Sequence, residues 1–158
     1  MEKGLTWGVG NLRFHKAEAR VGRFENVWRQ LTLFGGVQYG FIRPDLARDT
    51  VPIFERYTFG GANSVRGYEE QDLGPRDSRS APLGGEAFAA VNLEVRHPIY
   101  KRLFGVLFLD GGQLWQRDPG ASWPHVRLQK LHDLAYSTGT GIRIHTPIGA
   151  LRFEVGYK

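Results

Sequence analysis

The sequence has 158 residues, enough for one domain with a hydrophobic core. It contains 21 glycines, 13% aromatic residues and no cysteine, which excludes disulfides and thiol chemistry and favours a β protein with many turns. The net charge is +5, but the basic residues are dispersed and no run of about 18 apolar residues occurs, so neither a nucleic-acid interface nor a transmembrane helix is expected.

The first part of the chain predicts β-strands. Residues 5–15 are predicted to form one strand, whereas residues 17–27 have no clear period. A clean alternation follows from residue 31 to residue 41. One face of that strand carries Leu31, Leu33, Gly35, Val37, Tyr39 and Phe41.

A long segment without periodicity follows, over residues 43–85, and is rich in glycine, proline and charged residues. Connections of this length in a compact domain are usually functional or disordered. Near its centre lies the motif Gly60-Gly61-Ala62-Asn63-Ser64-Val65-Arg66-Gly67-Tyr68. Because Arg66 stands between small and aromatic residues, we expect it to dock at a specific place.

Four more strands are predicted after this loop, over residues 87–96, 103–115, 136–146 and 151–157. The first has one aliphatic face, and the second places Asp110 in the middle of an apolar run. The polar faces of these strands carry Glu94, Arg96, Asp110, Arg143, Arg152 and Glu154 together with several glycines. Charges of both signs mixed with glycines favour a polar lumen occupied by a loop.

Long and short connections alternate along the chain, which is typical of an up-and-down outer-membrane barrel. Residues 43–85 and 116–134 form the long connections, and turns at Pro98 and Pro147 form the short ones. A soluble β-cup would show the same alternation, with its aliphatic face turned inward. Parity alone does not distinguish these two arrangements.

Three motifs give the chain a family resemblance. The first is the loop motif around Val65, Arg66, Gly67 and Tyr68. The others are the strand motif Phe108-x-Asp110-x-Gly112 and the hairpin from Ser137-Thr138-Gly139-x-Gly141 to Thr146-Pro147-Ile148-Gly149. In this order, over residues 5–158, the motifs resemble the outer-membrane protein assembly family. That bacterial surface antigen group includes the central subunit of the barrel assembly machinery and the two-partner secretion transporters.

The resemblance implies an all-β, antiparallel transmembrane barrel of sixteen strands, of which this chain is the C-terminal part. It also implies that the loop folds into the lumen, where Arg66 meets Asp110, with Glu94 nearby. The parity of both carboxylates agrees, and a buried carboxylate needs a partner such as arginine. Gly67 would permit a sharp backbone path and Tyr68 would pack against the wall. The alternative is a solvated loop arginine and an unrelated aspartate.

The resemblance further predicts one C-terminal barrel region over residues 1–158, with about six strands, a lumenal loop over 43–85 and no periplasmic repeat domains. We expect a non-enzymatic role in the outer membrane: inserting β-barrel proteins into it, or translocating polypeptides across it. The expected partners are lipid, unfolded β-barrel or secreted polypeptides, and the remaining strands or another copy that closes the barrel. The alternatives are a passive barrel or pore, or a soluble basic β-domain that binds an anionic partner.

No cofactor or metal site is expected. The five histidines lack the i, i+4 spacing of a zinc site, and the glycine-rich loop lacks the Lys-Ser/Thr of a phosphate-binding loop. Ser64 also lacks the context of a nucleophile elbow.

Overall fold

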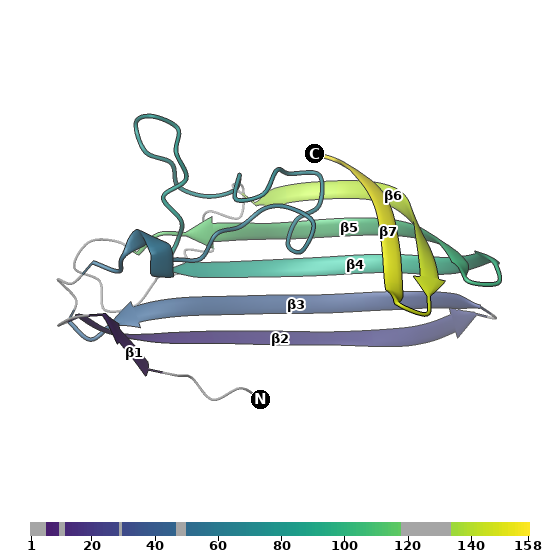
Figure 1. The fold of residues 1–158 in the computed structure, drawn as a ribbon, viewed down its shortest axis with the longest axis horizontal. Helices are drawn as coiled ribbons and strands as arrows, with labels where there is room; N and C mark the ends of the chain where they lie inside the picture. The colour runs from purple at the N-terminus through teal and green to yellow at the C-terminus, as the bar shows by residue number, and fades with distance from the viewer. Residues whose placement is uncertain (1–5, 10–11, 29, 47–49, 118–133) are drawn as a thin grey trace.

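The computed structural model describes residues 6–9, 12–28, 30–46, 50–117 and 134–158. Over these ranges the chain forms one antiparallel sheet of seven strands, arranged in the order of the sequence (Figure 1). The strands are β1 (Thr6–Val9), β2 (Leu12–Trp28), β3 (Leu31–Pro44), β4 (Ala87–Tyr100), β5 (Leu103–Trp115), β6 (Ala135–Thr146) and β7 (Gly149–Tyr157). This confirms the all-β antiparallel fold. No helix in these ranges is long and apolar enough to span a membrane.

The connections alternate in length, as the sequence predicts. The long loop between β3 and β4 covers residues 45–86 and contains the short 3-10 turn η1 (Ile53–Glu55). Two residues join β4 to β5, and two join β6 to β7. Pro98, predicted to lie in a turn, instead belongs to β4, next to a register shift between Pro98 and Tyr100. Proline is tolerated in a strand at such an irregularity. Most of the second long connection, over residues 118–133, lies outside the described residues.

The prediction of one strand over residues 5–15 was wrong. The chain reverses between Val9 and Leu12, which pair with each other, so β1 and β2 form a hairpin. β2 then continues through the stretch that had no clear period. That pattern was obscured because Arg23 and Glu25, on the outer face of β2, form an ion pair with each other where the other strands carry apolar residues.

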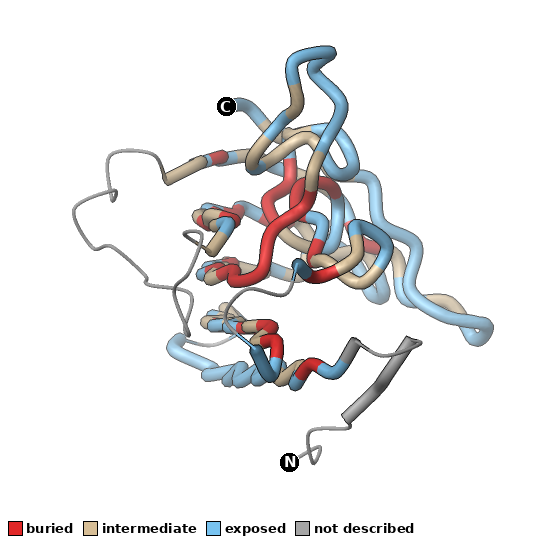
Figure 2. The backbone as a smooth tube through the Cα atoms, turned by 90° about the vertical axis from the view of Figure 1, so that its left-hand side faces the viewer, coloured by how far each residue is buried: buried red, intermediate tan, exposed pale blue. Residues whose placement is uncertain are grey.

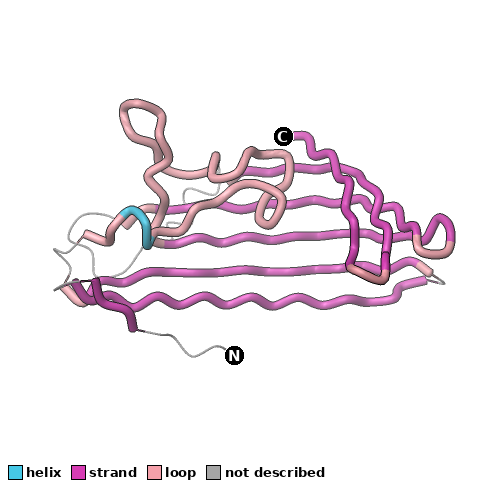
Figure 3. The backbone as a smooth tube through the Cα atoms, in the orientation of Figure 1, coloured by secondary structure: helices cyan, strands magenta, loops and turns pink. Residues whose placement is uncertain are grey.

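The sheet is curled, and the long loop lies on its concave side (Figures 2 and 3). Side chains that face the loop are buried, including Glu94 and Asp110. The aliphatic side chains of the opposite parity are exposed, as Val91 at 46% and Leu93 at 47% illustrate. This orientation is the reverse of a soluble cup with an aliphatic interior and matches a barrel whose apolar face is turned outward.

A hydrophobic core fills part of the space between the loop and the wall. Phe88 on β4 packs against the loop residues Tyr57 and Phe59, with ring centroids 4.7 and 5.5 Å apart. A Cβ on Gly112 of β5 would lie 2.6 Å from the ring of Phe59, so this glycine makes room for the aromatic ring. The loop is therefore packed against the sheet as well as tethered by polar contacts.

Tyr57 also ties the base of the loop to β2. Its hydroxyl donates a hydrogen bond to the carbonyl oxygen of Ala17 at 3.0 Å. The Nζ of Lys16 donates to the carbonyl of Glu55 at 2.8 Å and lies 4.7 Å from the centroid of the Tyr57 ring. This anchor is separate from the one that Arg66 makes.

Replacing Tyr57 by phenylalanine is expected to lower the free energy of unfolding by about 1 kcal/mol, because one hydrogen bond is lost while the ring packing remains. Urea unfolding of the two proteins measures the change. Tyr136→Phe is the matched control, since Tyr136 is 56% exposed on the outer face of β6. Equal midpoints for the two variants would contradict the anchor.

Candidate functional site

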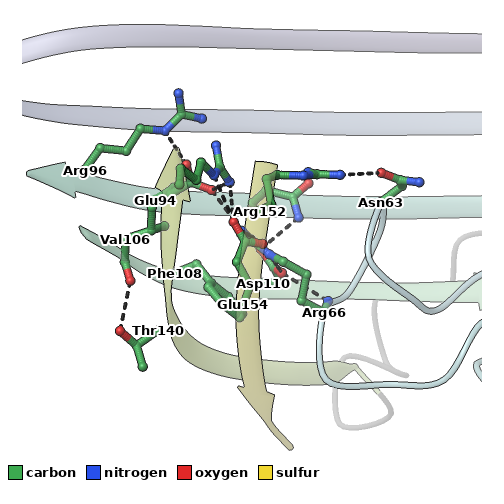
Figure 4. A network of polar contacts seen from close by, with 12 residues as sticks. Asn63, Arg66, Glu94, Arg96, Val106, Phe108, Asp110, Thr140, Arg152 and Glu154 are labelled. Atoms are coloured by element: carbon green, nitrogen blue, oxygen red, sulfur yellow. Dashed lines mark hydrogen bonds and ion pairs between the residues drawn. The ribbon is translucent and has the colours of Figure 1, made fainter. Parts of the chain in front are cut away.

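The candidate site is the point where the long loop meets the inner wall (Figure 4). The side chain of Val65 is fully buried there, and that of Arg66 is only 10% exposed. The carbonyl oxygen of Ser64 accepts a hydrogen bond from Asn92 Nδ2 of β4 at 2.8 Å. The segment that carries the arginine is thus fixed through its backbone as well as through the guanidinium.

Asp110 is the main partner of Arg66. Its carboxylate is completely buried and accepts two parallel hydrogen bonds from the guanidinium, with Nε–Oδ2 at 2.6 Å and Nη2–Oδ1 at 2.8 Å. The backbone N–H of Arg66 donates to Oδ2 at 3.1 Å, and Asn92 Nδ2 donates to Oδ1 at 2.9 Å. Two-pronged pairs of this kind fix both distance and orientation. The four donors satisfy a carboxylate that would otherwise be costly to bury.

Two further carboxylates bind the remaining side of the guanidinium. Nη1 of Arg66 donates to Glu94 on β4 at 2.9 Å and to Glu154 on β7 at 3.1 Å. The guanidinium carbon also lies 3.7 Å from the centroid of the Phe108 ring, so the cation stacks on an aromatic face. Burial by itself would lower the pKa of Arg66, but the hydrogen bonds to Asp110, Glu94 and Glu154 outweigh it and hold the pKa above its ordinary value.

Arg143 and Arg96 complete the cluster. Nη2 of Arg143 on β6 donates to Glu94 at 2.6 Å and to Glu154 at 2.7 Å, and Nε of Arg96 donates to the other oxygen of Glu94. With Arg66 and Asp110, three arginines and three carboxylates meet, so their formal charges balance. This balance is what allows so many ions to be buried together, because an unpaired buried charge is strongly unfavourable.

Glycine residues let the loop approach β7 closely. Gly67 has φ of +89°, a conformation that favours glycine, and follows directly after the arginine. A Cβ on Gly156 of β7 would lie 2.7 Å from both N and Cα of Gly67. Next to this contact the hydroxyl of Tyr68 donates to the carbonyl of Tyr136 at 3.4 Å. The backbone of the loop therefore lies directly against the backbone of the last strand.

The structure brings together the residues predicted from the sequence: Arg66 with Asp110 and Glu94, and Phe108 beneath the guanidinium. Val65 and Gly112 belong to the hydrophobic packing beside it, and Gly67 and Tyr68 contact β7 and β6. The predicted partners of Arg66 did not include Glu154 or Asn92, and Arg143 was not assigned to the cluster. All three lie on the polar parity of their strands, which was the available signal, but parity does not show which polar side chains meet.

The arrangement holds a charged loop against the inner wall. Every ionised group in the cluster is engaged in an ion pair. Among the described residues no group of three or more His, Asp and Glu side chains could hold a metal ion. Two of the five histidines, His125 and His132, lie outside those residues.

Comparisons with known proteins agree with the fold. The chain is 36% identical over 111 residues to an outer membrane protein assembly factor BamA of Nitratidesulfovibrio vulgaris, covering 68% of this chain and 13% of that protein. It is 31% identical over 120 residues to a SAM50-like protein of Schizosaccharomyces pombe, covering 71% of this chain and 24% of that protein. The crystal structure of BamA from Haemophilus ducreyi lacking POTRA domains 1–3 matches with a TM-score of 0.71 at 18% identity, over 91% of this chain and 31% of the other.

The chain thus spans between 13% and 24% of the length of these two relatives. The structural match confirms the resemblance of the sheet to part of the BamA barrel. The relatives confirm the predicted outer-membrane localisation. The model of the Omp85 superfamily domain matches residues 2–158, and the chain belongs to the Omp85 superfamily.

Proposed function

We propose that this chain forms part of an outer-membrane barrel that assembles β-barrel proteins and inserts them into the membrane, and that the loop carrying Arg66 is a plug held in the lumen by Asp110 and Glu94. Relatives named as assembly factors support the first part of the proposal. The buried ion cluster supports the second part, because it ties the loop to three strands of the wall.

The two faces of the sheet support a position in lipid. Exposed aliphatic and aromatic side chains such as Leu107, Leu109 and Phe153 lie on the outer face, while the ions lie on the inner face. Because open sheet edges are not tolerated in hydrocarbon, further strands or another copy must complete the barrel. The wall would then enclose the loop and keep its ion pairs away from lipid.

The role would require no covalent chemistry. A polypeptide that is to become a β-barrel must pair its strands before they enter the lipid, and an existing strand edge can template that pairing. Among the described residues, β7 pairs only with β6 and carries the carboxylate of Glu154 that binds Arg66. The plug would hold the wall next to this edge in one arrangement while a substrate strand pairs.

The test is Arg66→Ala in the complete barrel that contains this chain. The variant leaves the three carboxylates of the cluster with one cation fewer, so we expect a loop that is cleaved more rapidly by added protease. We also expect a barrel that assembles a model outer-membrane protein several-fold more slowly. Arg79→Ala is the matched control, because Arg79 lies in the same loop and is exposed. Its side chain has no ion pair among the described residues.

Normal assembly with unchanged loop cleavage in Arg66→Ala would contradict the plug. A passive barrel or pore makes a different prediction. In a passive barrel, Arg66→Ala would still alter loop cleavage. Neither the variant nor the unmodified barrel in proteoliposomes would then assemble the substrate faster than protein-free liposomes do.

A further inference from the structure

A cavity of about 490 Å³ lies beside the ion cluster, between the inner face of β2 and β3 and the tip of the loop at Ala62 and Asn63. Its size is within the usual range of ligand sites, roughly 300–1,000 Å³. The side chains of the loop line this cavity without filling it. Its lining contains five arginines and a single carboxylate, that of Glu94.

The floor of the cavity is aromatic. Phe24 on β2 and Phe34 on β3 are cross-strand neighbours whose ring centroids lie 4.5 Å apart. A Cβ on the adjacent Gly22 or Gly36 would lie 2.9 Å from the ring of Phe34, so these glycines let the ring lie flat along the wall. The floor thus offers an apolar surface next to the charges.

Arg96 is held in place above this floor. Its guanidinium carbon lies 4.8 Å from the centroid of Phe24 and 6.0 Å from that of Phe34, and its Nε is bound to Glu94. Among the described residues neither terminal nitrogen has a hydrogen-bond partner. A stacked guanidinium with free donors is preorganised to bind an oxyanion.

Two more arginines line the cavity with spare donors. Arg152 on β7 makes one long hydrogen bond, of 3.4 Å, from Nη2 to Asn63 Oδ1, and within the described ranges it forms no ion pair (Figure 4). Arg20 on β2 lies 3.5 Å from Glu18, but its side chain is 66% exposed, so this pair is weak. The cavity therefore has guanidinium groups that the carboxylates of the wall do not saturate.

We propose that this cavity binds the carboxylate side chains of an acidic polypeptide segment. The arginines of the cavity already bind carboxylates on the wall, as Arg96 does with Glu94. The rings of Phe24 and Phe34 would contact the aliphatic stems of the bound side chains, a surface that a small inorganic anion would not use. The identity of the natural ligand rests on the proposed function, in which polypeptides pass this wall. Binding of a peptide can nevertheless be measured without any assembly reaction.

The test is calorimetric titration of the complete barrel, in detergent, with an acetylated hexaglutamate peptide. We expect saturable binding that weakens with added salt, and no binding of hexaglutamine. In the double variant Arg20→Gln, Arg152→Gln we expect the affinity to fall by about tenfold or more, because two charge-assisted contacts are lost. Both positions are exposed, so the fold is retained.

Arg23→Gln is the matched control. Arg23 lies on the same strand as Arg20 but on the outer face. The affinity of the Arg23→Gln barrel for the peptide should stay within about twofold of that of the unmodified barrel. No saturable binding, or equal affinity in the double variant, would overturn the site whatever the outcome of the assembly assay. Inorganic phosphate that displaces the peptide at the same concentration as free hexaglutamate would overturn the assignment to a polypeptide.

Discussion

Asp110→Ala is expected to release the Arg66 loop and to lower the free energy of unfolding by about 3–5 kcal/mol. The carboxylate is completely buried and accepts four hydrogen bonds, three of them from Arg66. Without Asp110 the cluster keeps three arginines but only two carboxylates, so one positive charge has no counterion. The cost comes mainly from the uncompensated buried cation rather than from the lost pair itself.

Two measurements check this expectation in the complete barrel: the urea midpoint and the rate at which added protease cleaves the loop. Glu69→Ala is the control, because Glu69 is an exposed carboxylate two residues beyond the Gly67 turn. It should change the free energy of unfolding by less than about 0.5 kcal/mol. Asp110→Ala with the stability and protease resistance of the control would mean that the pair does not hold the loop.

Gly156→Ala is expected to displace the loop from β7 even though it adds only one methyl group. The new Cβ would lie 2.7 Å from backbone atoms of Gly67 and 3.0 Å from the carbonyl carbon of Arg66. Backbone atoms cannot rotate away as the end of a side chain can, so either the loop or the strand must move. Overpacking of this kind typically costs about 1–3 kcal/mol.

Gly35→Ala provides the comparison. Gly35 lies on the outer face of β3, where a Cβ would have only Leu93 nearby, at an ordinary contact distance of 3.8 Å. Faster cleavage of the loop in Gly156→Ala, with no change in Gly35→Ala, is the expected result. Identical cleavage in the two variants would show that the close approach of Gly67 and Gly156 does not position the loop.

The strands after the loop were predictable because uncharged, mostly apolar residues recur at every second position along each of them. β5 is the clearest case, since its predicted and observed bounds are both residues 103–115. β2 was missed because charged residues occupy part of its outer face, which removes the alternation on which the prediction depends. The hairpin between Val9 and Leu12 was likewise missed, although glycine and asparagine stand between its strands.

For the site, the sequence indicated which residues carry charge on the inner wall but not how far the loop reaches. Asp110 and Glu94 lie on neighbouring strands, so one arginine could be expected to meet both. Glu154 lies 88 residues after Arg66 in the sequence. The two side chains meet only because β6 and β7 fold toward the loop. That contact depends on the curl of the whole sheet, which local alternation does not encode.

A double-mutant cycle of Arg66→Gln and Asp110→Asn in the complete barrel tests the central claim most directly. Urea unfolding gives the free energy of unfolding of the unmodified protein, both single variants and the double variant. If the pair holds the loop, each single variant loses stability and the double variant loses little more than either alone, with a coupling energy of about 3 kcal/mol. Additive losses, with a coupling energy near zero, would contradict the account.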